Sequence, residues 1–425
     1  MKAVVFHGIG DIRLDNVPEP KIKHPLDAIV RLTASAICGT DLHMVRGTLS
    51  PMQPGTILGH EGVGVVEELG AKVRNFKKGD RVVIGSTIGC GSCLYCRTGY
   101  YSQCDKANPN GPSAGTAFYG GPKNSGPFNG LQAEFARVPF ANTNLVKLPV
   151  AVTDDQAIML SDIFPTGYFG ADLAQIKDGE IVAVFGCGPV GQFAIASAFL
   201  LNAGRVIAID TVPDRLAMAR DQGAEVIDFN AEDPVEAIKE LTDGSGVDRV
   251  IDAVGVDAEP PQRGPAVEQA AKYRELFEEE LKKIAPEAKP QGKLWKPGQA
   301  PSQVQLWAVD SVCKAGTIAV IGVYPTTMMW FPLGKVMNRD LTVQAGNCNH
   351  RRYLPELIRI VERGELDPEH ILTKREPLMS AIDAYKAFDQ RQPGWIKVEL
   401  ELEAEGEAPK PRFAVEESSS RRGRR

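Results

Sequence analysis

The sequence lacks the features that would place it in a membrane, outside the cell or on nucleic acid. No run of about 18 apolar residues occurs, so no membrane span is expected. Residues 1–8 turn polar too early for a signal peptide. The net charge of −6 provides no general attraction for nucleic acid. With 43% hydrophobic and 24% charged residues, the 425-residue chain has the composition of a soluble globular protein with room for two cores.

Cysteine and histidine are scarce, at eight and six residues, which makes their clustering informative. Four of the cysteines fall close together, at Cys90, Cys93, Cys96 and Cys104. Four thiolates at these spacings can close a tetrahedral shell around one structural Zn²⁺. Disulfides are the alternative, but cysteines so close in one loop cannot all pair without strain. A zinc lobe and no export signal predict a reducing, cytoplasmic location.

The pattern of the chain changes near residue 155. Residues 1–155 contain short β segments separated by Gly and Pro, which predicts a barrel-like β domain; the clearest segments are 2–6, 27–34, 62–69 and 81–84. Residues 156–334 alternate strands with helices, which predicts a doubly wound parallel sheet. The strands are expected at 180–185, 205–210, 225–228, 248–253 and 316–323, and the helices at 192–202, 215–222 and 234–242. Residues 335–402 are expected to complete the first domain, with a returning strand at 395–402.

Two segments stand apart from these domains. Residues 256–305 are rich in proline and charge and interrupt the alternation, so we expect a surface insertion that is helical over 266–284. Residues 403–425 are acidic, then Ser-rich, and end in arginines, a composition typical of disorder. The terminal arginines are interpreted as a solvated tail, with contact to RNA or an anionic surface as the alternative.

A dinucleotide-binding motif follows the expected strand at 180–185. Gly186, Gly188 and Gly191 form G-x-G-x-x-G with Cys187, Pro189 and Val190 between them, and a helix follows. In this context the glycines allow a tight turn and a close approach of pyrophosphate to the helix N-terminus.

Residues beyond the motif indicate which dinucleotide binds. Asp210 ends the next strand, where its carboxylate can accept from the ribose hydroxyls and repel a 2′-phosphate. We therefore predict NAD rather than NADP, although the nearby Arg215 keeps NADP open. Later strand ends place three further candidates beside the nicotinamide, Val254, Gly322 and Val323, for which plain sheet packing is the alternative.

A second group of metal-type residues lies upstream, in Cys38–His43 and in the pair His60 and Glu61. Each element alone is weak, because an isolated Cys or His is more often a packed core residue. Together with the cysteine lobe and the glycine motif, they make residues 1–255 and 306–400 resemble the zinc-dependent medium-chain alcohol dehydrogenase family. Residues 160–168 more specifically resemble the formaldehyde dehydrogenase branch.

The resemblance implies a GroES-like β-barrel catalytic domain joined to a Rossmann domain. It implies two Zn²⁺ per chain, the catalytic ion being held by Cys38, His60 and Asp162 with Glu61 just behind. It also implies that Thr40 and His43 relay a proton through the nicotinamide ribose, histidine's ordinary pKa near 6.5 being suited to that role. The alternatives are a turn-capping hydroxyl for Thr40 and a surface imidazole for His43.

The implied reaction is transfer of a hydride from an alcohol or a hydrated aldehyde to NAD, since both substrates present the same H–C–O–H unit. A polyol or threonine-type dehydrogenase is an alternative within the family, and a nonenzymatic zinc and RNA-binding protein is an alternative of another class. The family implies a homodimer or homotetramer. The insertion at 256–305 is interpreted as a cover over the adenosine half that slows NAD release, with a decorative segment or subunit contact as the alternative.

Overall fold

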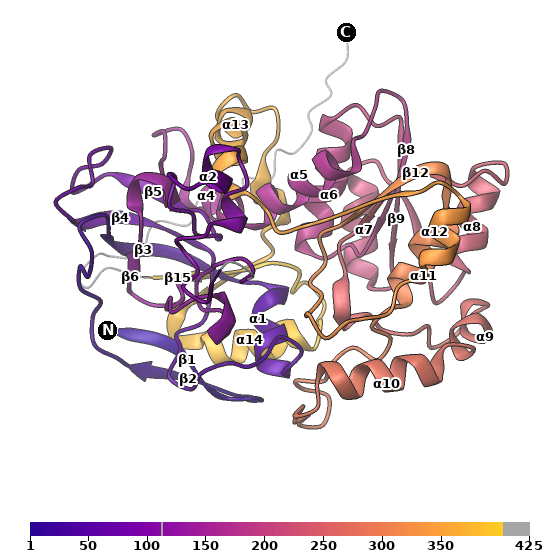
Figure 1. Cartoon of the computed structure of the whole chain (residues 1–425), viewed down its shortest axis with the longest axis horizontal. Coiled ribbons are helices and arrows are strands. Elements are labelled where there is room, and N and C mark those ends of the chain that lie inside the picture. Colours follow the sequence, from indigo (N-terminus) through magenta and orange to yellow (C-terminus); the bar gives the residue numbers. More distant parts are fainter. Residues whose placement is uncertain (112–113, 403–425) are drawn as a thin grey trace, which may run out of the picture.

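Two β-sheets, each with its own core, organise the chain (Figure 1). The computed structural model describes residues 1–111 and 114–402. The first sheet has seven strands, six of them in the order β14-β15-β3-β4-β5-β7, with β6 paired to β3. The second has six parallel strands in the order β10-β9-β8-β11-β12-β13. The tail at 403–425, for which we expected disorder, lies outside the described residues.

The first sheet belongs to the barrel-like part that the sequence predicted. Its strands are β3 (Ala28–Ile37), β4 (Gly62–Leu69), β5 (Arg81–Ile84), β6 (Phe135–Val138), β7 (Leu145–Lys147), β14 (Lys374–Pro377) and β15 (Val398–Glu401). Strands β1 (Lys2–Gly8) and β2 (Asp11–Asn16) form a separate hairpin. Strand β15 pairs antiparallel with β3, so the C-terminal segment returns to this sheet as the sequence indicated.

Helices interrupt this first part, including residues 1–155, where the sequence predicted only β structure. They are α1 (Gly39–Arg46), α2 (Leu94–Arg97), α3 (Ala141–Asn144), α4 (Asp154–Ser161), α13 (His350–Glu362) and α14 (Ala381–Asp389), with 3₁₀ turns η1 (Tyr101–Gln103), η2 (Lys123–Ser125), η4 (Pro368–Ile371) and η5 (Leu378–Ser380). Helix α1 was missed because its first turn, Gly39 to Asp41, has the composition of a loop. It is capped at its start by Cys38 and Asp41 and ends at Gly47, whose φ of 83° suits glycine.

The second sheet is a Rossmann-type sheet. Its strands are β8 (Ile181–Phe185), β9 (Arg205–Asp210), β10 (Glu225–Asp228), β11 (Val247–Asp252), β12 (Val312–Val320) and β13 (Thr342–Ala345). Its helices are α5 (Ile163–Ala174), α6 (Pro189–Leu200), α7 (Pro213–Asp221), α8 (Pro234–Leu241), α11 (Gln303–Ser311) and α12 (Leu333–Asn338). The strand order reverses between β8 and β11, so a ligand crevice is expected where their carboxyl ends diverge.

Several boundaries in this second part differ from the predicted ones. Helices α6 and α7 begin earlier, at Pro189 and Pro213, because proline fits the first helical turn, where its missing N–H costs nothing. Strand β12 begins at Val312 rather than at residue 316. Strand β13 extends the sheet beyond residue 334, where we had placed the end of the nucleotide-binding domain; being short and mostly exposed, it gives little sequence signal.

The insertion at 256–305 contacts both parts of the molecule. It begins at η3 (Gly255–Asp257) and contains α9 (Ala266–Ala271) and α10 (Arg274–Ile284), which lie below α11 at the lower edge of the second part (Figure 1). Further along, Trp295 is only 3% exposed and packs into the core of the first sheet. Gln291 Nε2 donates to the carbonyl of Gly10 at 3.1 Å. The insertion is therefore held against the first part of the chain as well as joined to the second.

None of the helices within residues 1–111 and 114–402 combines the length and apolarity needed to cross a membrane.

Candidate active site and metal centres

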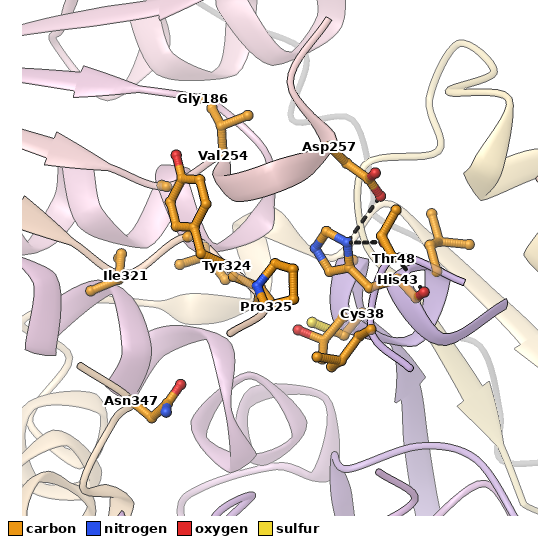
Figure 2. A pocket seen from close by; sticks show the side chains of 18 of the residues that line it. Cys38, His43, Thr48, Gly186, Val254, Asp257, Ile321, Tyr324, Pro325 and Asn347 are labelled. Carbon is orange, nitrogen blue, oxygen red and sulfur yellow. Dashed lines mark hydrogen bonds and ion pairs between the residues drawn. The ribbon is translucent and has the colours of Figure 1, made fainter. Parts of the chain in front are cut away.

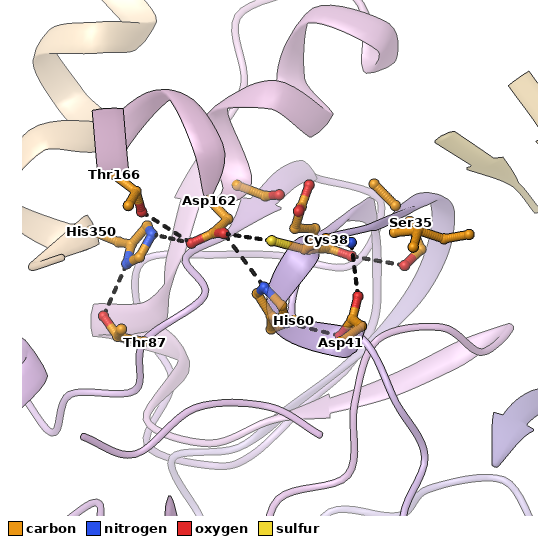
Figure 3. A network of polar contacts seen from close by, with 12 residues as sticks. Ser35, Cys38, Asp41, His60, Thr87, Asp162, Thr166 and His350 are labelled. Atoms are coloured by element: carbon orange, nitrogen blue, oxygen red, sulfur yellow. Dashed lines mark hydrogen bonds and ion pairs between the residues drawn. The ribbon is translucent and has the colours of Figure 1, made fainter. Parts of the chain in front are cut away.

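Four buried side chains converge where the first sheet meets helices α4 and α5 (Figure 3). Each of them offers a metal-ligating atom within 4.8 Å of the others: Cys38, His60, Glu61 and Asp162. Cys38 is the N-cap of α1, and Asp162 lies at the break between α4 and α5, with φ −145° and ψ −63°. The fold thus gathers residues far apart in the sequence, as the resemblance implied.

The two carboxylate oxygens of Asp162 contact different groups. Oδ2 lies 3.4 Å from His60 Nε2 and 3.8 Å from Cys38 Sγ. Oδ1 faces His350 Nε2 at 2.9 Å and accepts from Thr166 Oγ1 at 3.2 Å (Figure 3). Burial alone would raise the pKa of Asp162, but the bonds to His350 and His60 outweigh it and hold the pKa well below its usual range. Asp162 is therefore an anchored carboxylate with one oxygen aimed at the ligand group.

A second carboxylate orients His60. Asp41 Oδ2 accepts from the Cys38 backbone N–H at 2.9 Å, and Oδ1 lies 3.2 Å from His60 Nδ1, without hydrogen-bond alignment. A carboxylate behind the far ring nitrogen is a common support for a metal-ligating histidine, since it fixes the ring with the other nitrogen forward. That other nitrogen, Nε2, is the one facing Asp162.

This donor set fits a zinc ion. A thiol, an imidazole and a carboxylate oxygen are the ligand types of a three-residue site with one open position. Burial raises the pKa of the Cys38 thiol. A bound cation supplies the positive charge that a buried thiolate needs, so metal binding and deprotonation of Cys38 are coupled.

Glu61 occupies a different position from the other three. Its carboxylate is fully buried and receives Lys397 Nζ on both oxygens at 2.6 Å. Burial would lower the pKa of Lys397, but the charge of Glu61 outweighs it and the pKa is raised. Unlike the other three, Glu61 does not line the cavity described below. Glu61 therefore lies behind the three side chains that line the cavity.

The cysteine lobe forms a second ligand group at Cys90, Cys93, Cys96 and Cys104. All four are free thiols, and Cys93 Sγ and Cys104 Sγ lie 3.8 Å apart, so the disulfide alternative is not adopted. Backbone N–H groups point at the sulfurs: Cys90 N donates to Cys104 Sγ at 3.2 Å, and Cys93 N to Cys90 Sγ at 3.3 Å. Such bonds stabilise thiolates, and the closed four-sulfur set fits a structural zinc ion.

One cavity of about 960 Å³ joins the first ligand group to the glycine loop (Figure 2). Cys38, His60 and Asp162 lie at one end, with Thr40 and His43 also on its wall. The wall continues through nine of the predicted cofactor residues: Gly186, Gly188, Pro189, Val190, Asp210, Arg215, Val254, Gly322 and Val323. The remaining one, Gly191, instead allows close packing, since a Cβ there would lie 1.8 Å from the carbonyl oxygen of Gly186.

Asp210 is held by backbone groups at the far end of the cavity. Oδ2 accepts from Cys187 N at 2.8 Å, and Oδ1 accepts from Thr211 N at 2.7 Å and Val212 N at 2.9 Å. Arg215 Nη1 lies 3.9 Å from Oδ2. The carboxylate of Asp210 is thus fixed beside the glycine loop, and Arg215 lies close enough to contact the same part of a bound cofactor.

Sequence reasoning missed several residues that shape the site. His350 and Lys397 bond directly to Asp162 and Glu61, and Asp257 contacts His43 across the two parts of the chain. His350 is one of only six histidines, and this scarcity was the one signal that could have drawn attention to it. The other two contacts arise only from tertiary packing.

Comparisons with known proteins agree with this geometry. Residues 24–150 match the family described as alcohol dehydrogenase GroES-like domain, and residues 189–262 match zinc-binding dehydrogenase. A Bacillus subtilis zinc-type alcohol dehydrogenase-like protein is 37% identical over 404 residues, covering 94% of this chain and all of its own length. The chain belongs to the zinc-dependent medium-chain alcohol dehydrogenase family. Membership implies zinc and a nicotinamide cofactor, and confirms the fold expected from the sequence.

Two further relatives differ in how much of the chain they match. The structure of the alcohol dehydrogenase TADH from Thermus sp. ATN1 superimposes with a TM-score of 0.77 at 33% identity, covering 95% of this chain and 100% of that one. A glutathione-independent formaldehyde dehydrogenase from Pseudomonas aeruginosa is 40% identical over 268 residues, which span 60% of this chain and 66% of that protein. The match to this formaldehyde dehydrogenase thus covers only part of the chain.

Proposed function

We propose that this protein is an NAD-dependent zinc dehydrogenase that removes hydride from an alcohol or a hydrated aldehyde. The observation that carries the proposal is the single cavity connecting Cys38, His60 and Asp162 with Gly186 and Gly188. A substrate oxygen at the ligand group and a nicotinamide extending from the glycine loop would share that space. A gem-diol presents the same reacting unit as an alcohol, so one site serves both.

The roles of the residues follow from their placement. Cys38, His60 and Asp162 would hold the catalytic zinc ion, which when bound lowers the pKa of a coordinated hydroxyl group. Thr40 lies on the cavity wall beside Cys38 and would accept the hydroxyl proton. His43, on the same helix, also lines the cavity and would exchange a proton with it. Glu61 and Lys397 form a buried ion pair behind these residues.

The preference for NAD rests on Asp210. Its carboxylate, held by three backbone N–H groups, presents fixed negative charge at the end of the cavity away from the metal ligands. A 2′-phosphate there would meet like charge, whereas ribose hydroxyls could donate to it. Arg215 is the residue that would favour NADP. Comparing kcat/KM for the two cofactors tests this; a higher value with NADP would overturn the assignment.

The substrate class is tested by a panel. Alcohols, formaldehyde and other aldehydes, polyols and threonine are each offered with NAD, and NADH fluorescence is followed. The proposal expects the best turnover with a simple alcohol or a hydrated aldehyde. An optimum on a polyol or on threonine would replace it with the corresponding dehydrogenase, and a zinc-loaded protein inert toward the whole panel would remove the enzymatic assignment.

The insertion at 256–305 would cover the bound cofactor. Glu259, Lys283, Ile284 and Pro286 line the same cavity as Asp210 and Arg215. Because the segment is also fastened to the first sheet through Trp295, cofactor release would require those contacts to loosen. NAD retained through gel filtration would support this cover, and NAD lost on simple dialysis would count against it.

The two ligand groups lead us to propose two zinc ions per chain, one catalytic and one structural. A cytoplasmic homodimer or homotetramer remains our proposal for the assembled state. Sedimentation of the zinc-loaded protein measures the assembly directly.

A further inference from the structure

His43 is buried and its ring is held from one side. It is 6% exposed on helix α1, and its Nδ1 lies 3.0 Å from Thr48 Oγ1 and 2.9 Å from Asp257 Oδ2 (Figure 2). The Thr48 hydroxyl donates to the backbone carbonyl of His43 at 3.3 Å, which leaves its lone pairs free to accept. Nδ1 therefore faces two acceptors.

Asp257 is fixed from three sides. Its Oδ1 accepts from Gly298 N at 3.0 Å, and its Oδ2 accepts from Arg46 Nη1 at 2.8 Å. Burial alone would raise the pKa of Asp257, but the charges of protonated His43 and of Arg46 outweigh it and hold the pKa well below its usual range; the charge of Arg46 remains when His43 is neutral. A Cβ at residue 298 would lie 2.2 Å from the carbonyl carbon of Asp257, so glycine is required there. Asp257 is thus an ionised carboxylate locked against the histidine.

We infer that Asp257 is a positioning residue that keeps the proton on His43 Nδ1 and so leaves Nε2 as the atom that exchanges protons with the cavity. An ionised carboxylate has no proton to donate, and a bare Nδ1 lone pair facing it would be repelled. The Nδ1–H tautomer satisfies both Asp257 and Thr48. This inference rests on the proposed function, in which a proton must leave the substrate hydroxyl.

The proton step balances without any further reactant. Nε2 of neutral His43 takes one proton from the cavity side, and the imidazolium that forms is stabilised by Asp257. The same proton then leaves Nε2 for solvent, while Nδ1 keeps its own proton throughout. The hydride and its electron pair leave the substrate carbon separately, for the nicotinamide.

The contact between His43 and Asp257 gives the insertion at 256–305 a role beyond covering the cofactor. His43 comes from the first part of the chain, whereas Asp257 and Gly298 stand near the two ends of the segment at 256–305. The segment would therefore complete the proton path as well as cover the cofactor. A change that detached it would alter the tautomer of His43 without touching a metal ligand.

Other charged groups near this pair must be considered when pH is varied. Arg46 donates from Nε to Asp389 Oδ1 at 3.0 Å, which links α1 to α14. Glu259 lies on the insertion side, where burial raises its pKa against the charges of Arg391 and Arg46. Asp389 gives the matched control, because Asp389→Asn disturbs Arg46 and leaves Asp257 beside the histidine.

The direct test reads the tautomer and needs no turnover. Protein labelled with ¹⁵N-histidine has only six histidines to resolve, and His43→Ala assigns the signal in long-range ¹H–¹⁵N spectra recorded over a pH series. We expect wild-type His43 as the Nδ1–H tautomer when neutral, a shift toward Nε2–H in Asp257→Asn, and the wild-type tautomer in Asp389→Asn. The inference would be overturned if wild-type His43 were the Nε2–H tautomer, or if Asp257→Asn left the tautomer unchanged. The wild-type spectrum alone can overturn the inference, even if the variant does not fold.

Kinetics provide the second test, once the wild-type enzyme is shown to form NADH. Asp257→Asn should lower the rate at neutral pH by roughly 10- to 100-fold and recover toward wild type as pH rises. In the His43→Ala background the same substitution should cost nothing further, because it acts through His43. Additive losses, or a loss independent of pH, would overturn the inference. If the wild type forms no NADH with any substrate, the proposed function fails instead, and the tautomer measurement remains.

Discussion

Replacing Glu399 by glutamine should stabilise this protein increasingly as pH rises. Glu399, on β15, is 3% exposed, and within the described part of the chain its Oε2 has no hydrogen-bond partner. Its cross-strand neighbour Arg375 is engaged by Asp155, with Nε to Oδ2 at 2.9 Å. Burial first, and then the charge of Asp155, raise the pKa of Glu399 from 4.5 to about 8.

The sign and size of the effect follow from linkage. A group whose pKa is higher in the folded state contributes its full stability below the unfolded pKa and loses it as pH rises through the folded pKa. Between about pH 4.5 and pH 8, Glu399 is therefore ionised in the unfolded chain but protonated in the folded protein, and the folded state loses stability as pH rises. From pH 5 to pH 7 this shift corresponds to a cost on the order of 2 kcal/mol to the wild type. Glutamine, which does not titrate, avoids that cost.

The assay is the difference in melting temperature between Glu399→Gln and wild type, measured from pH 5 to pH 8. Other titrating groups are shared and largely cancel, so the difference should widen with pH by a few °C. Glu401→Gln, at an exposed position on the same strand, removes one of the weaker charges that raise the pKa of Glu399, so its difference from wild type should widen with pH in the same direction but by less. A difference for Glu399→Gln that stays flat or narrows with pH would refute the reasoning.

Three further substitutions test other parts of the structure. Lys397→Met leaves Glu61 buried without its partner and should cost about 3 to 5 kcal/mol in denaturant unfolding, whereas Lys397→Arg should cost less; equal effects would contradict the ion pair. Cys93→Ser should remove the structural zinc and lower the melting temperature, and a zinc content matching wild type would count against the lobe. Trp295→Ala should speed NAD release in stopped-flow measurements, and an unchanged release rate would separate the insertion from cofactor retention.

The sheets were largely predictable because their strands carry local signals. The buried runs at β4, β5 and β9 gave exact or nearly exact bounds, since apolar residues bounded by turn residues form a self-contained pattern. Strand β13 and helix α1 were missed for the opposite reason. The first is exposed and short, and the second opens on residues that also suit a loop.

In the site, too, only local patterns could be read from the sequence. The spacing of the four cysteines indicated a zinc lobe, and the glycine motif indicated a dinucleotide site. The grouping of Cys38 and His60 with Asp162 came from the family resemblance, because no local pattern links residues so far apart. The partners of these groups were beyond reach. Lys397 is an unremarkable lysine in the sequence, and only the pairing of β15 with β3 brings it to Glu61. The packing of Trp295 into the other core likewise has no sequence signature.

The zinc content of Asp162→Ala, set against that of the wild type, tests the central claim most directly. If Cys38, His60 and Asp162 hold one ion and the cysteine lobe another, mass spectrometry should find about two zinc ions per wild-type chain and about one in the variant. The variant should keep its fold and lose turnover. Zinc content equal to that of the wild type, with activity retained, would contradict the assignment of the catalytic centre.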